Sequence, residues 1–387
     1  MLVFGYPILL DLGIKTLIFA FVLLACLKLK ITTVPIFILV GLVSSPLIVR
    51  EGALLVIAET GIVLLFFLLG LEYPLDKMIK IAKKIWFGGV LDIGVNLVIP
   101  MLAAYYVSLS WPAAFLVGGV TYASSSSITL KMLEDQKRFA NPESDYMIAL
   151  LIFEDIVAPI VVTLITVLYI QGEFTILTGA AVFGRVVFLI GISLLLAKFV
   201  FTRFADKFNH RLNEQFVLLF GVSMALIFSG LALLLGLSEL LGAFLAGVML
   251  SELKHPEKFD KVILPVRNIT LPFFFVWFGA GIELGEGILS VPLLIFIIIW
   301  AVIGKIIVGI IGGKVFGLSK KAAIRGGFSL VQRGEFSVVI AAVAAAELRS
   351  FSGIYIVLTA LIGMLFFAKA SGWTDSICAK FLTKGNK

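Results

Sequence analysis

Residues 146–170 read YMIALLIFEDIVAPIVVTLITVLYI, and this stretch decides the kind of fold. It is as long as a helix that crosses the hydrocarbon core of a bilayer, which needs about 20 apolar residues. Its only charges, Glu154 and Asp155, lie side by side near the middle. An ionisable side chain at that depth is costly and usually marks a pathway for ions or protons. The stretch therefore predicts a membrane protein whose chemistry is centred on this pair.

The composition of the whole chain supports this prediction. Apolar residues make up 61% of the 387 residues, charged residues make up 14%, and the mean hydropathy is +1.14. So little polar surface would not cover a water-soluble globule. The first apolar stretch has no basic n-region and no small-residue cleavage site, so we expect it to be retained as a span.

Turns, charges and Gly or Pro breaks divide the chain into about thirteen spans. They are expected near 7–27, 33–48, 54–71, 85–107, 112–132, 146–170, 177–202, 215–236, 239–251, 262–282, 290–313, 322–346 and 352–372. The piece at 239–251 is short for a full span, which favours a re-entrant or interrupted helix there. We expect one all-α membrane domain over 1–387, with a short cytoplasmic tail at 373–387.

Lys and Arg are concentrated in every second loop. The basic set of loops and the tail hold Lys28, Lys30, Lys77, Lys80, Lys83, Lys84, Lys137, Arg138, Arg203, Lys207, Arg211, Lys254, Lys258, Lys261, Lys320, Lys321, Lys380, Lys384 and Lys387. The opposite set holds little more than Arg50 and Arg349. Because cytoplasmic loops are enriched in Lys and Arg, this alternation predicts an odd number of spans, an external N-terminus and a cytoplasmic C-terminus. Basic loops on one side of a membrane also explain the net charge of +7, so no nucleic-acid partner is predicted.

Few other charges fall within the predicted spans. Lys305 stands alone in WAVIGKIIVGIIGG, where an ammonium paired with a carboxylate would hold helices together and set the proton affinity of that carboxylate. Asp92 and Asn96 lie at i and i+4, which predicts a buried hydrogen-bonding patch on one helical face. Glu59 fits a packing role as well as a functional one.

The run TYASSSSIT at 121–129 places hydroxyl groups in the middle of an apolar span. Hard monovalent cations prefer oxygen ligands. Consecutive serines also compete for nearby backbone groups, so the run predicts an interrupted helix with carbonyl groups as further ligands. Close packing of helices is the alternative reason for such small residues. The span at 322–346 carries Arg325, Gln332, Arg333 and Glu335, and its Gly326, Gly327 and Gly334 predict a second interruption.

These groups suffice for exchange of a cation against protons. A carboxylate in a partly dehydrated cavity binds protons more tightly, so a proton and a cation compete for it. Suppose that the carrier changes readily between its outward-open and inward-open states only when a cation or a proton is bound. The flow of cations in one direction is then tied to the flow of protons in the other. No cofactor is expected beyond the transported ions.

Segments along nearly the whole chain resemble, in the same order, the membrane domain of Kef-type and related sodium/proton antiporters of the cation/proton antiporter superfamily. The matching segments are AETGIVLLFFLLGLEY at 58–73, ASSSSITLKMLED at 123–135, ALLIFEDIVAPIV at 149–161, GLSELLGAFLAGVMLSE at 236–252, FFFVWFGAGIEL at 273–284 and QRGEFSVVIAA at 332–342. The resemblance implies a homodimer, a moving core domain, elevator-type alternating access and crossed interrupted helices. It also implies two inverted repeats, at 1–170 and 215–372, joined by a linking helix at 177–202.

The resemblance also implies roles for single residues. Asp155 looks like the carboxylate that binds the metal cation, Na+ or K+, or a proton in turn, and Glu154 resembles the preceding position, which is linked to ion choice. Lys305 looks like the basic partner of that position in some branches. The ion-binding hydroxyls would come from Thr121, Ser124, Ser125, Ser126 and Ser127. Arg333 and Glu335 look like the charged pair of the second crossing helix.

Two departures from the Kef-type pattern count against a glutathione-gated potassium efflux protein. Kef-type chains commonly read Gln-Asp where this chain reads Glu-Asp, and they carry a nucleotide-binding regulatory domain, for which the expected tail is too short. Regulation would then come from a separate cytoplasmic regulatory subunit or from a truncated part of the chain, or would be absent. A potassium efflux antiporter with such a subunit is the alternative to sodium/proton exchange.

Other classes fit less well. A cation channel would need a selectivity filter, and no TVGYG-like segment occurs. A sodium-coupled symporter would need groups to hold an organic solute. An enzyme is not expected, because the serine run has no GxSxG setting and His210 and His255 fall in predicted cytoplasmic loops. We therefore expect an antiporter of a prokaryotic plasma membrane that exchanges Na+ (or K+) for H+.

Overall fold

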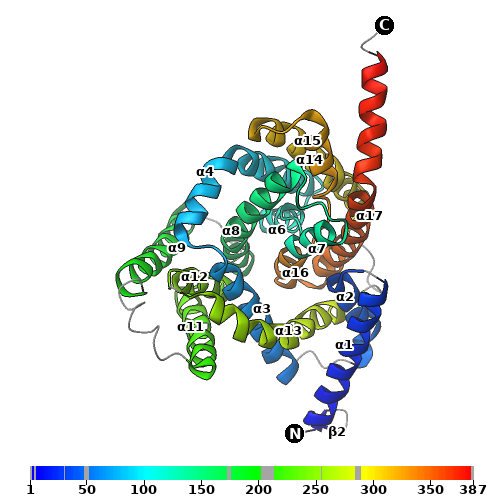
Figure 1. The fold of residues 1–387 in the computed structure, drawn as a ribbon. Coiled ribbons are helices and arrows are strands. Elements are labelled where there is room, and N and C mark those ends of the chain that lie inside the picture. Colours follow the sequence, from blue (N-terminus) through cyan, green and yellow to red (C-terminus); the bar gives the residue numbers. More distant parts are fainter. Residues whose placement is uncertain are drawn as a thin grey trace. The chain divides into compact units, whose positions relative to one another are not determined.

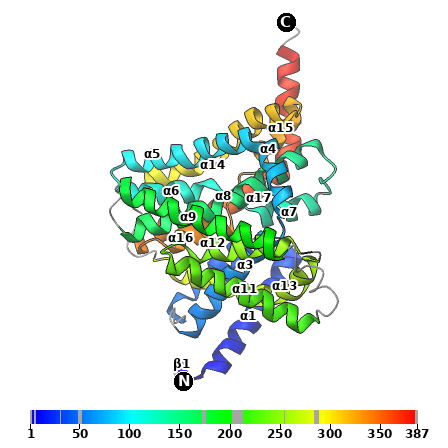
Figure 2. The same cartoon turned by 90° about the vertical axis from the view of Figure 1, so that its left-hand side faces the viewer.

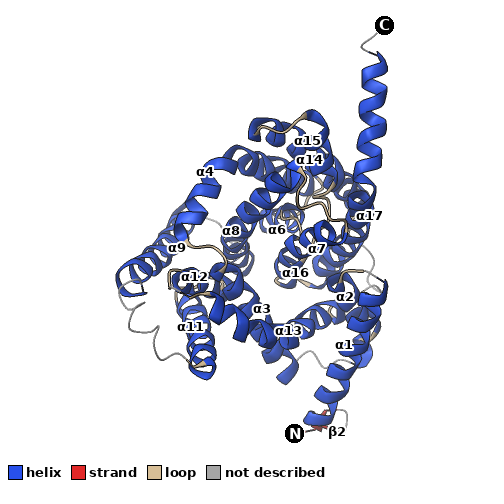
Figure 3. Cartoon of the chain, in the orientation of Figure 1, coloured by secondary structure: helices blue, strands red, loops and turns tan. Residues whose placement is uncertain are grey.

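The computed structural model describes residues 2–3, 6–29, 31–47, 52–171, 176–201, 213–253, 255–283 and 289–384. Most of this part of the chain is helical, and β1 (Leu2–Val3) and β2 (Tyr6–Pro7) form a short antiparallel pair (Figure 3). Nine of the described helices are long and apolar enough to cross a membrane, and two shorter apolar helices cover Thr33–Val43 and Glu239–Ser251. An all-helical protein with several membrane spans is thus confirmed.

The helices form two compact units, and each unit combines two separate segments of the chain. One unit comprises Met1–Met78 and Val162–Ile282, and the other comprises Ile79–Val161 and Glu283–Lys387. Each unit therefore contains helices from both halves of the sequence, as the colours of Figures 1 and 2 show.

The first unit packs helices backbone to backbone. Its main helices are α1 (Ile8–Leu29), α2 (Thr33–Val43), α3 (Ala53–Leu71), α9 (Ile176–Leu196), α11 (Glu214–Leu234), α12 (Glu239–Ser251) and α13 (Glu257–Ala280). A Cβ at Gly70 of α3 would meet the main chain at Phe244 of α12, and a Cβ at Gly247 of α12 would meet the main chain at Phe67. Small residues let transmembrane helices approach this closely.

The second unit contains all the residues that the sequence assigns to the ion site. Its helices are α4 (Leu75–Asp92), the π-helical segment η2 (Ile93–Val98), α5 (Ile99–Tyr106), α6 (Trp111–Tyr122), α7 (Ser126–Asp135), α8 (Pro142–Gln171), α14 (Val291–Phe316), α15 (Lys320–Phe328), α16 (Glu335–Ala342) and α17 (Ala346–Lys384). The first four residues of α4 and the last ten residues of α8 belong to the other unit. The continuous helix Leu75–Tyr106 contains η2, and a π-helical turn of this kind is frequent at functional sites.

Two helical stretches of this unit are interrupted, between α6 and α7 and between α15 and α16. Ala123 and Ser125 have extended backbone angles, and the Ser125 side chain caps α7 by accepting from the Ile128 N–H. The second interruption runs from Ser329 to Gly334. Gly326 and Gly327, expected to loosen this helix, lie within α15 instead. Gly327 allows close packing, because a Cβ there would lie 2.8 Å from Ile306 Cα on α14.

Several element boundaries differ from those expected. The residues expected as a tail from 373 continue α17 as far as Lys384, and 385–387 lie outside the described residues. The helix expected at 177–202 corresponds to α9 followed by the π-helical segment Ala197–Phe201, and residue 202 lies outside the described part. The span expected from 85 begins at Leu75, because its lysine-rich first half consists of good helix formers although it is not apolar.

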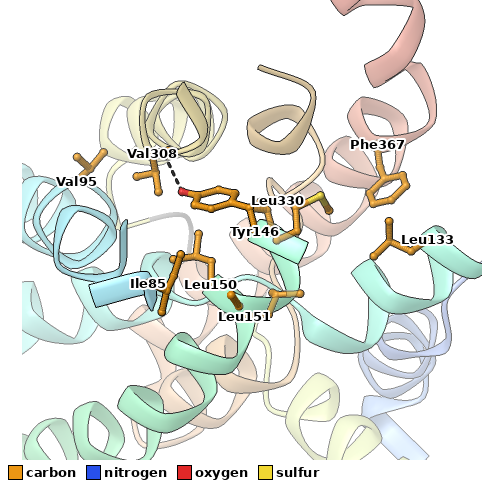
Figure 4. Packing of buried hydrophobic residues seen from close by; sticks show 11 residues of the cluster. Ile85, Val95, Leu133, Tyr146, Leu150, Leu151, Val308, Leu330 and Phe367 are labelled. Atoms are coloured by element: carbon orange, nitrogen blue, oxygen red, sulfur yellow. Dashed lines mark hydrogen bonds between the residues drawn. The ribbon is translucent and has the colours of Figure 1, made fainter. Parts of the chain in front are cut away.

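A cluster of buried apolar side chains holds α8 against α14 (Figure 4). Tyr146 of α8 lies in this cluster, and its hydroxyl donates to the Val308 carbonyl of α14 at 2.8 Å. Leu151 and Val308 each lie about one helical turn from a charged residue of the site, Glu154 and Lys305 respectively. The cluster therefore fixes the two helices that carry these charges.

Candidate functional site

The two interruptions lie side by side and run antiparallel. Ser124 and Arg333 form an isolated β-bridge, and the Ser125 N–H donates to the Gln332 carbonyl at 2.9 Å. The Ser124 hydroxyl donates to the Leu330 carbonyl, also at 2.9 Å. These bonds satisfy backbone groups that the broken helices leave without intrahelical partners.

Asp155 lies on α8 next to the start of α7. Asp155 is 2% exposed, and the Ser126 hydroxyl lies 2.9 Å from Oδ1 and 3.1 Å from Oδ2 of its carboxylate. Ser126 is the first residue of α7, and the N-terminus of a helix favours a nearby negative charge. Asp155 therefore offers carboxylate oxygens at a break in a membrane helix.

Glu154 faces a different set of groups from its neighbour. Its carboxylate accepts a hydrogen bond from the Ser124 N–H and one from Lys305 Nζ, which lies 2.9 Å from Oε1. Lys305 Nζ also lies 2.7 Å from Asp92 Oδ1. All three side chains are fully buried, so one ammonium joins two carboxylates away from solvent.

The hydroxyl groups of the serine run contact three different carboxylates. Ser125 and Ser127 each lie 3.1 Å from Glu335 Oε2, whereas Ser126 contacts Asp155. The structure thus places only one of these three side chains against Asp155. Ser124 contacts the Glu154 side of the site through its N–H and, at 3.5 Å, through its hydroxyl.

Thr121 is placed as a packing residue. Its hydroxyl donates within α6 to the Gly118 carbonyl and across to the Asn96 carbonyl of η2, both at 2.9 Å. The contact to Asn96 holds α6 against the π-helical segment, which brings Asp92 toward the interruption of the α6–α7 pair.

Arg333 and Glu335 make separate contacts. Arg333 is fully buried, and its Nε donates to the Tyr355 hydroxyl of α17 at 3.2 Å while Nη1 lies 3.4 Å from the Ser124 hydroxyl. Glu335 begins α16 and accepts from the serines of α7. No ion pair between Arg333 and Glu335 occurs in the described part of the chain, so the two charges act on different neighbours.

The sequence did not place Asp92 or Tyr355 in the site. Asp92 and Asn96 stood out as a buried pair, and their i, i+4 spacing matches the 2.8 Å bond from Asn96 Nδ2 to Asp92 Oδ1. Nothing in the sequence linked Asp92 to Lys305, which follows it by 213 residues. Tyr355 carries no signal in the sequence, because an aromatic residue in an apolar helix is usually a packing residue.

Arg138 differs from its expected place in a solvated loop. It is 5% exposed, and its guanidinium donates to Glu143 Oε1 at 3.0 Å and to the Ser329 hydroxyl at 3.1 Å. Arg325 also binds Glu143, with Nη2 2.6 Å from Oε2. This buried group ties the α7–α8 connection to α15 and to the start of the second interruption. Glu59, by contrast, is exposed on α3 of the other unit.

The chemistry of the site is that of hard oxygen ligands and paired charges. Carboxylate and hydroxyl oxygens suit a small monovalent cation, and carboxylates also bind protons. Among the described residues, no group of three His, Cys, Asp or Glu side chains is arranged to hold a resident metal ion.

Comparison with known proteins agrees with this chemistry. Residues 16–376 match the family described as sodium/hydrogen exchanger, transmembrane. The chain is 43% identical over 361 residues to the ammonium/H(+) antiporter subunit AmhT of Alkalihalophilus pseudofirmus, covering 93% of this chain and 92% of that protein. It is 29% identical to the K(+)/H(+) antiporter subunit KhtU of Bacillus subtilis, with 87% of each chain covered.

The fold also matches a solved antiporter. The structure of the sodium proton antiporter MjNhaP1 from Methanocaldococcus jannaschii superimposes with a TM-score of 0.71, 16% sequence identity and coverage of 94% of this chain and 97% of that one. The chain therefore belongs to the family of transmembrane sodium/hydrogen exchangers and is a multi-pass monovalent cation/proton antiporter, not an enzyme.

Proposed function

We propose that the protein exchanges a monovalent cation for a proton at Asp155, which holds one of the two at a time. The contact that carries this proposal is the one between Asp155 and Ser126. It places a nearly buried carboxylate beside a hydroxyl at the interruption between α6 and α7. Further ligands for the cation would come from the serine run and the carbonyl groups of the interruption.

We propose potassium or ammonium as the exchanged cation in preference to sodium. The name of the relative that is 43% identical over most of both chains refers to ammonium, and that of the relative at 29% refers to K(+). Sodium, expected from the sequence, remains the third ion to compare. A relative that is 28% identical over 306 residues, the NhaS3 antiporter of Synechocystis, is named for Na(+).

The remaining architecture is proposed from the family pattern. The two short apolar helices and the two interrupted pairs would complete about thirteen spans, with an external N-terminus and a cytoplasmic C-terminus. Inverted repeats at 1–170 and 215–372 would place the unit with Asp155 as the moving core domain of an elevator. The other unit would form the dimer.

We further propose a prokaryotic plasma membrane as the location and a separate regulatory subunit as a partner, besides a second copy of this chain. Two relatives are named as subunits of their antiporters, which supports a partner chain.

The central test compares wild type with Asp155→Asn in proteoliposomes that contain a pH-sensitive dye. An outward gradient of potassium or ammonium should drive proton uptake in wild type, and Asp155→Asn should abolish it while its melting temperature in detergent stays close to wild type. Ammonia itself crosses lipid, so vesicles with Asp155→Asn also give the background for the ammonium series. Exchange retained in this variant would refute Asp155 as the binding site.

The identity of the cation is tested in the same vesicles. Initial rates are measured over a concentration series of ammonium, potassium and sodium chloride at one pH. We expect saturation at lower concentrations of ammonium or potassium than of sodium. Saturation by sodium alone would refute the proposed ion while leaving exchange at Asp155 intact.

A further inference from the structure

The first half of α4 carries a basic face that no acidic side chain neutralises. This face consists of Lys80, Lys83 and Lys84, which are all exposed, and none of the three forms an ion pair in the described part of the chain. Other exposed lysines do meet an acid. Lys261 Nζ lies 2.9 Å from a carboxylate oxygen, and Lys321 Nζ lies 2.7 Å from one.

The spacing along the helix makes these like charges neighbours. Lys80 and Lys83 are three residues apart, and Lys80 and Lys84 are four residues apart. Like charges at these spacings lie side by side on a helix and destabilise it. Asp76, one turn before Lys80, forms no ion pair with it in the described structure. A bound anion would therefore relieve a repulsion that the described chain leaves in place.

Another side of the same helix is fixed by packing. Ile85 is 1% exposed and belongs to the cluster of Figure 4, and Ile81 packs against that cluster. Lys84 Nζ lies 4.3 Å from the centre of the Phe316 ring of α14, which also packs against the cluster. The basic face thus stands on a helix that is held in place, with the lysines projecting from it.

Exposed apolar side chains form a seam beside the lysines. Ile79, Trp86 and Val90 are 52%, 59% and 56% exposed. Together with Lys83 they occupy positions 79, 83, 86 and 90, a spacing that places all four on one helical face. Lysine and tryptophan next to apolar residues are typical of a helix segment at the level of the lipid headgroups.

We propose that this part of α4 binds an anionic phospholipid, with the phosphate on the basic face and the acyl chains along the apolar seam. The unpaired ammonium groups favour a headgroup with net negative charge over one that brings its own positive charge. The seam favours a lipid over a soluble anion or an acidic protein. It extends to Val90, two residues before the buried Asp92 and within the apolar helix Leu75–Tyr106.

A lipid bound there would anchor a helix that also carries a residue of the ion site. The helix continues without a break from Lys84 to Asp92, a distance of about 12 Å along its axis. Asp92 contacts Lys305 at 2.7 Å. The membrane surface and the buried charges are therefore joined by one continuous element.

A binding measurement tests the proposal without any transport assay, so its result does not depend on the proposed function. Purified protein in an uncharged detergent is titrated with dioctanoyl phosphatidylglycerol while its melting temperature is followed. We expect a rise that saturates, because a ligand of the folded state stabilises it. Dioctanoyl phosphatidylcholine has the same acyl chains without the net charge, and glycerol phosphate is an anion without acyl chains. Neither should raise the melting temperature comparably.

Substitutions locate the lipid. Changing all three lysines of the basic face to Gln should raise the half-saturating lipid concentration about a hundredfold, or about fivefold for each lysine. Changing all three to Arg should preserve binding, because the charge is kept. Lys137→Gln with Lys369→Gln, two exposed lysines of the same unit outside α4, is the control and should bind nearly as wild type does.

High salt tests the role of charge without any substitution, since it screens exposed charges and should weaken binding to the wild-type protein. Binding that survives both high salt and the three Gln substitutions would overturn the proposal and leave the basic face to an acidic partner protein. Equal stabilisation by phosphatidylcholine or by glycerol phosphate would overturn it as well, and so would an equal loss of binding in the control variant.

Discussion

At the scale of single residues, Lys305 determines how the charges of the site balance. It contacts two carboxylates from different helices, and all three side chains are fully buried. A buried ion pair of this kind contributes little net stability relative to apolar packing, yet the loss of one partner is expensive. The residue therefore fixes a charge arrangement more than it adds stability.

Replacement of Lys305 by Met should destabilise the protein by about 3–5 kcal/mol, because Glu154 is left as an unpaired buried charge. The melting temperature in detergent measures the effect. The double variant Lys305→Met with Glu154→Gln should lose less stability than Lys305→Met alone, since both charges are then removed. Lys314→Met, at an exposed position on the same helix, provides the control. A double variant less stable than Lys305→Met alone would contradict the ion-pair explanation.

The serine run allows a second prediction at this scale. Ser126→Ala removes the hydroxyl that contacts Asp155, and a hydrogen bond to a charged group contributes about 1.5–3 kcal/mol. If that contact is needed to hold the carboxylate for the cation, KM for the cation should rise about ten- to hundredfold. Ser127→Ala, which loses a contact to Glu335 instead, should change KM much less. Equal effects from both variants would mean that Asp155 does not depend on Ser126.

At the scale of helices, the sequence identified where the chain is interrupted but not at which residue. Four serines in an apolar span predicted a break, yet only Ser124 and Ser125 lie in it, and Ser126 already begins α7. Gly326 and Gly327 suggested a break that in fact starts two residues later. Local preferences are weak compared with tertiary contacts, and here the bonds between the two interruptions set the boundary.

The contacts between distant helices were the part that the sequence did not predict. Asp92, Glu154 and Lys305 each stood out as a charge in an apolar span, which the cost of burial explains. That Lys305 reaches Asp92 as well as Glu154 depends on how α4, α8 and α14 pack. No periodicity within one helix contains that information.

The close approach of the two interruptions leads to a prediction for Gly334. A Cβ at this position would collide with the Ser125 side chain, whereas a Cβ at Gly326 would lie 3.5 Å from its nearest neighbour. Gly334→Ala should therefore cost about 1–3 kcal/mol and most of the exchange activity, because the interruptions must move apart. Gly326→Ala should leave both nearly unchanged. Thermal stability and proton uptake report the two effects, and full activity in Gly334→Ala would show that the crossing tolerates separation.

At the scale of the whole molecule, the two compact units differ in the residues that they contain. The unit formed by 79–161 and 283–387 holds the interruptions, the buried ammonium and every carboxylate assigned to the ion site. The other unit packs glycine-lined helices against one another. The sequence alone predicted a single membrane domain, because each unit is assembled from segments that alternate along the chain.

The charge carried per cycle is a property of the molecule as a whole, and it leads to the last prediction. If Lys305 stays charged beside Glu154 throughout the cycle, one cation leaves as one proton enters and no net charge crosses the membrane. A cycle that moved one charge would change in driving force by about 2.3 kcal/mol for every 100 mV. The initial rate should therefore stay constant when the potential across proteoliposomes is set at different values by an ionophore for an ion that the protein does not exchange. A rate that changes severalfold with the potential would mean that the cycle moves net charge, as it would if Lys305 released a second proton in each turn.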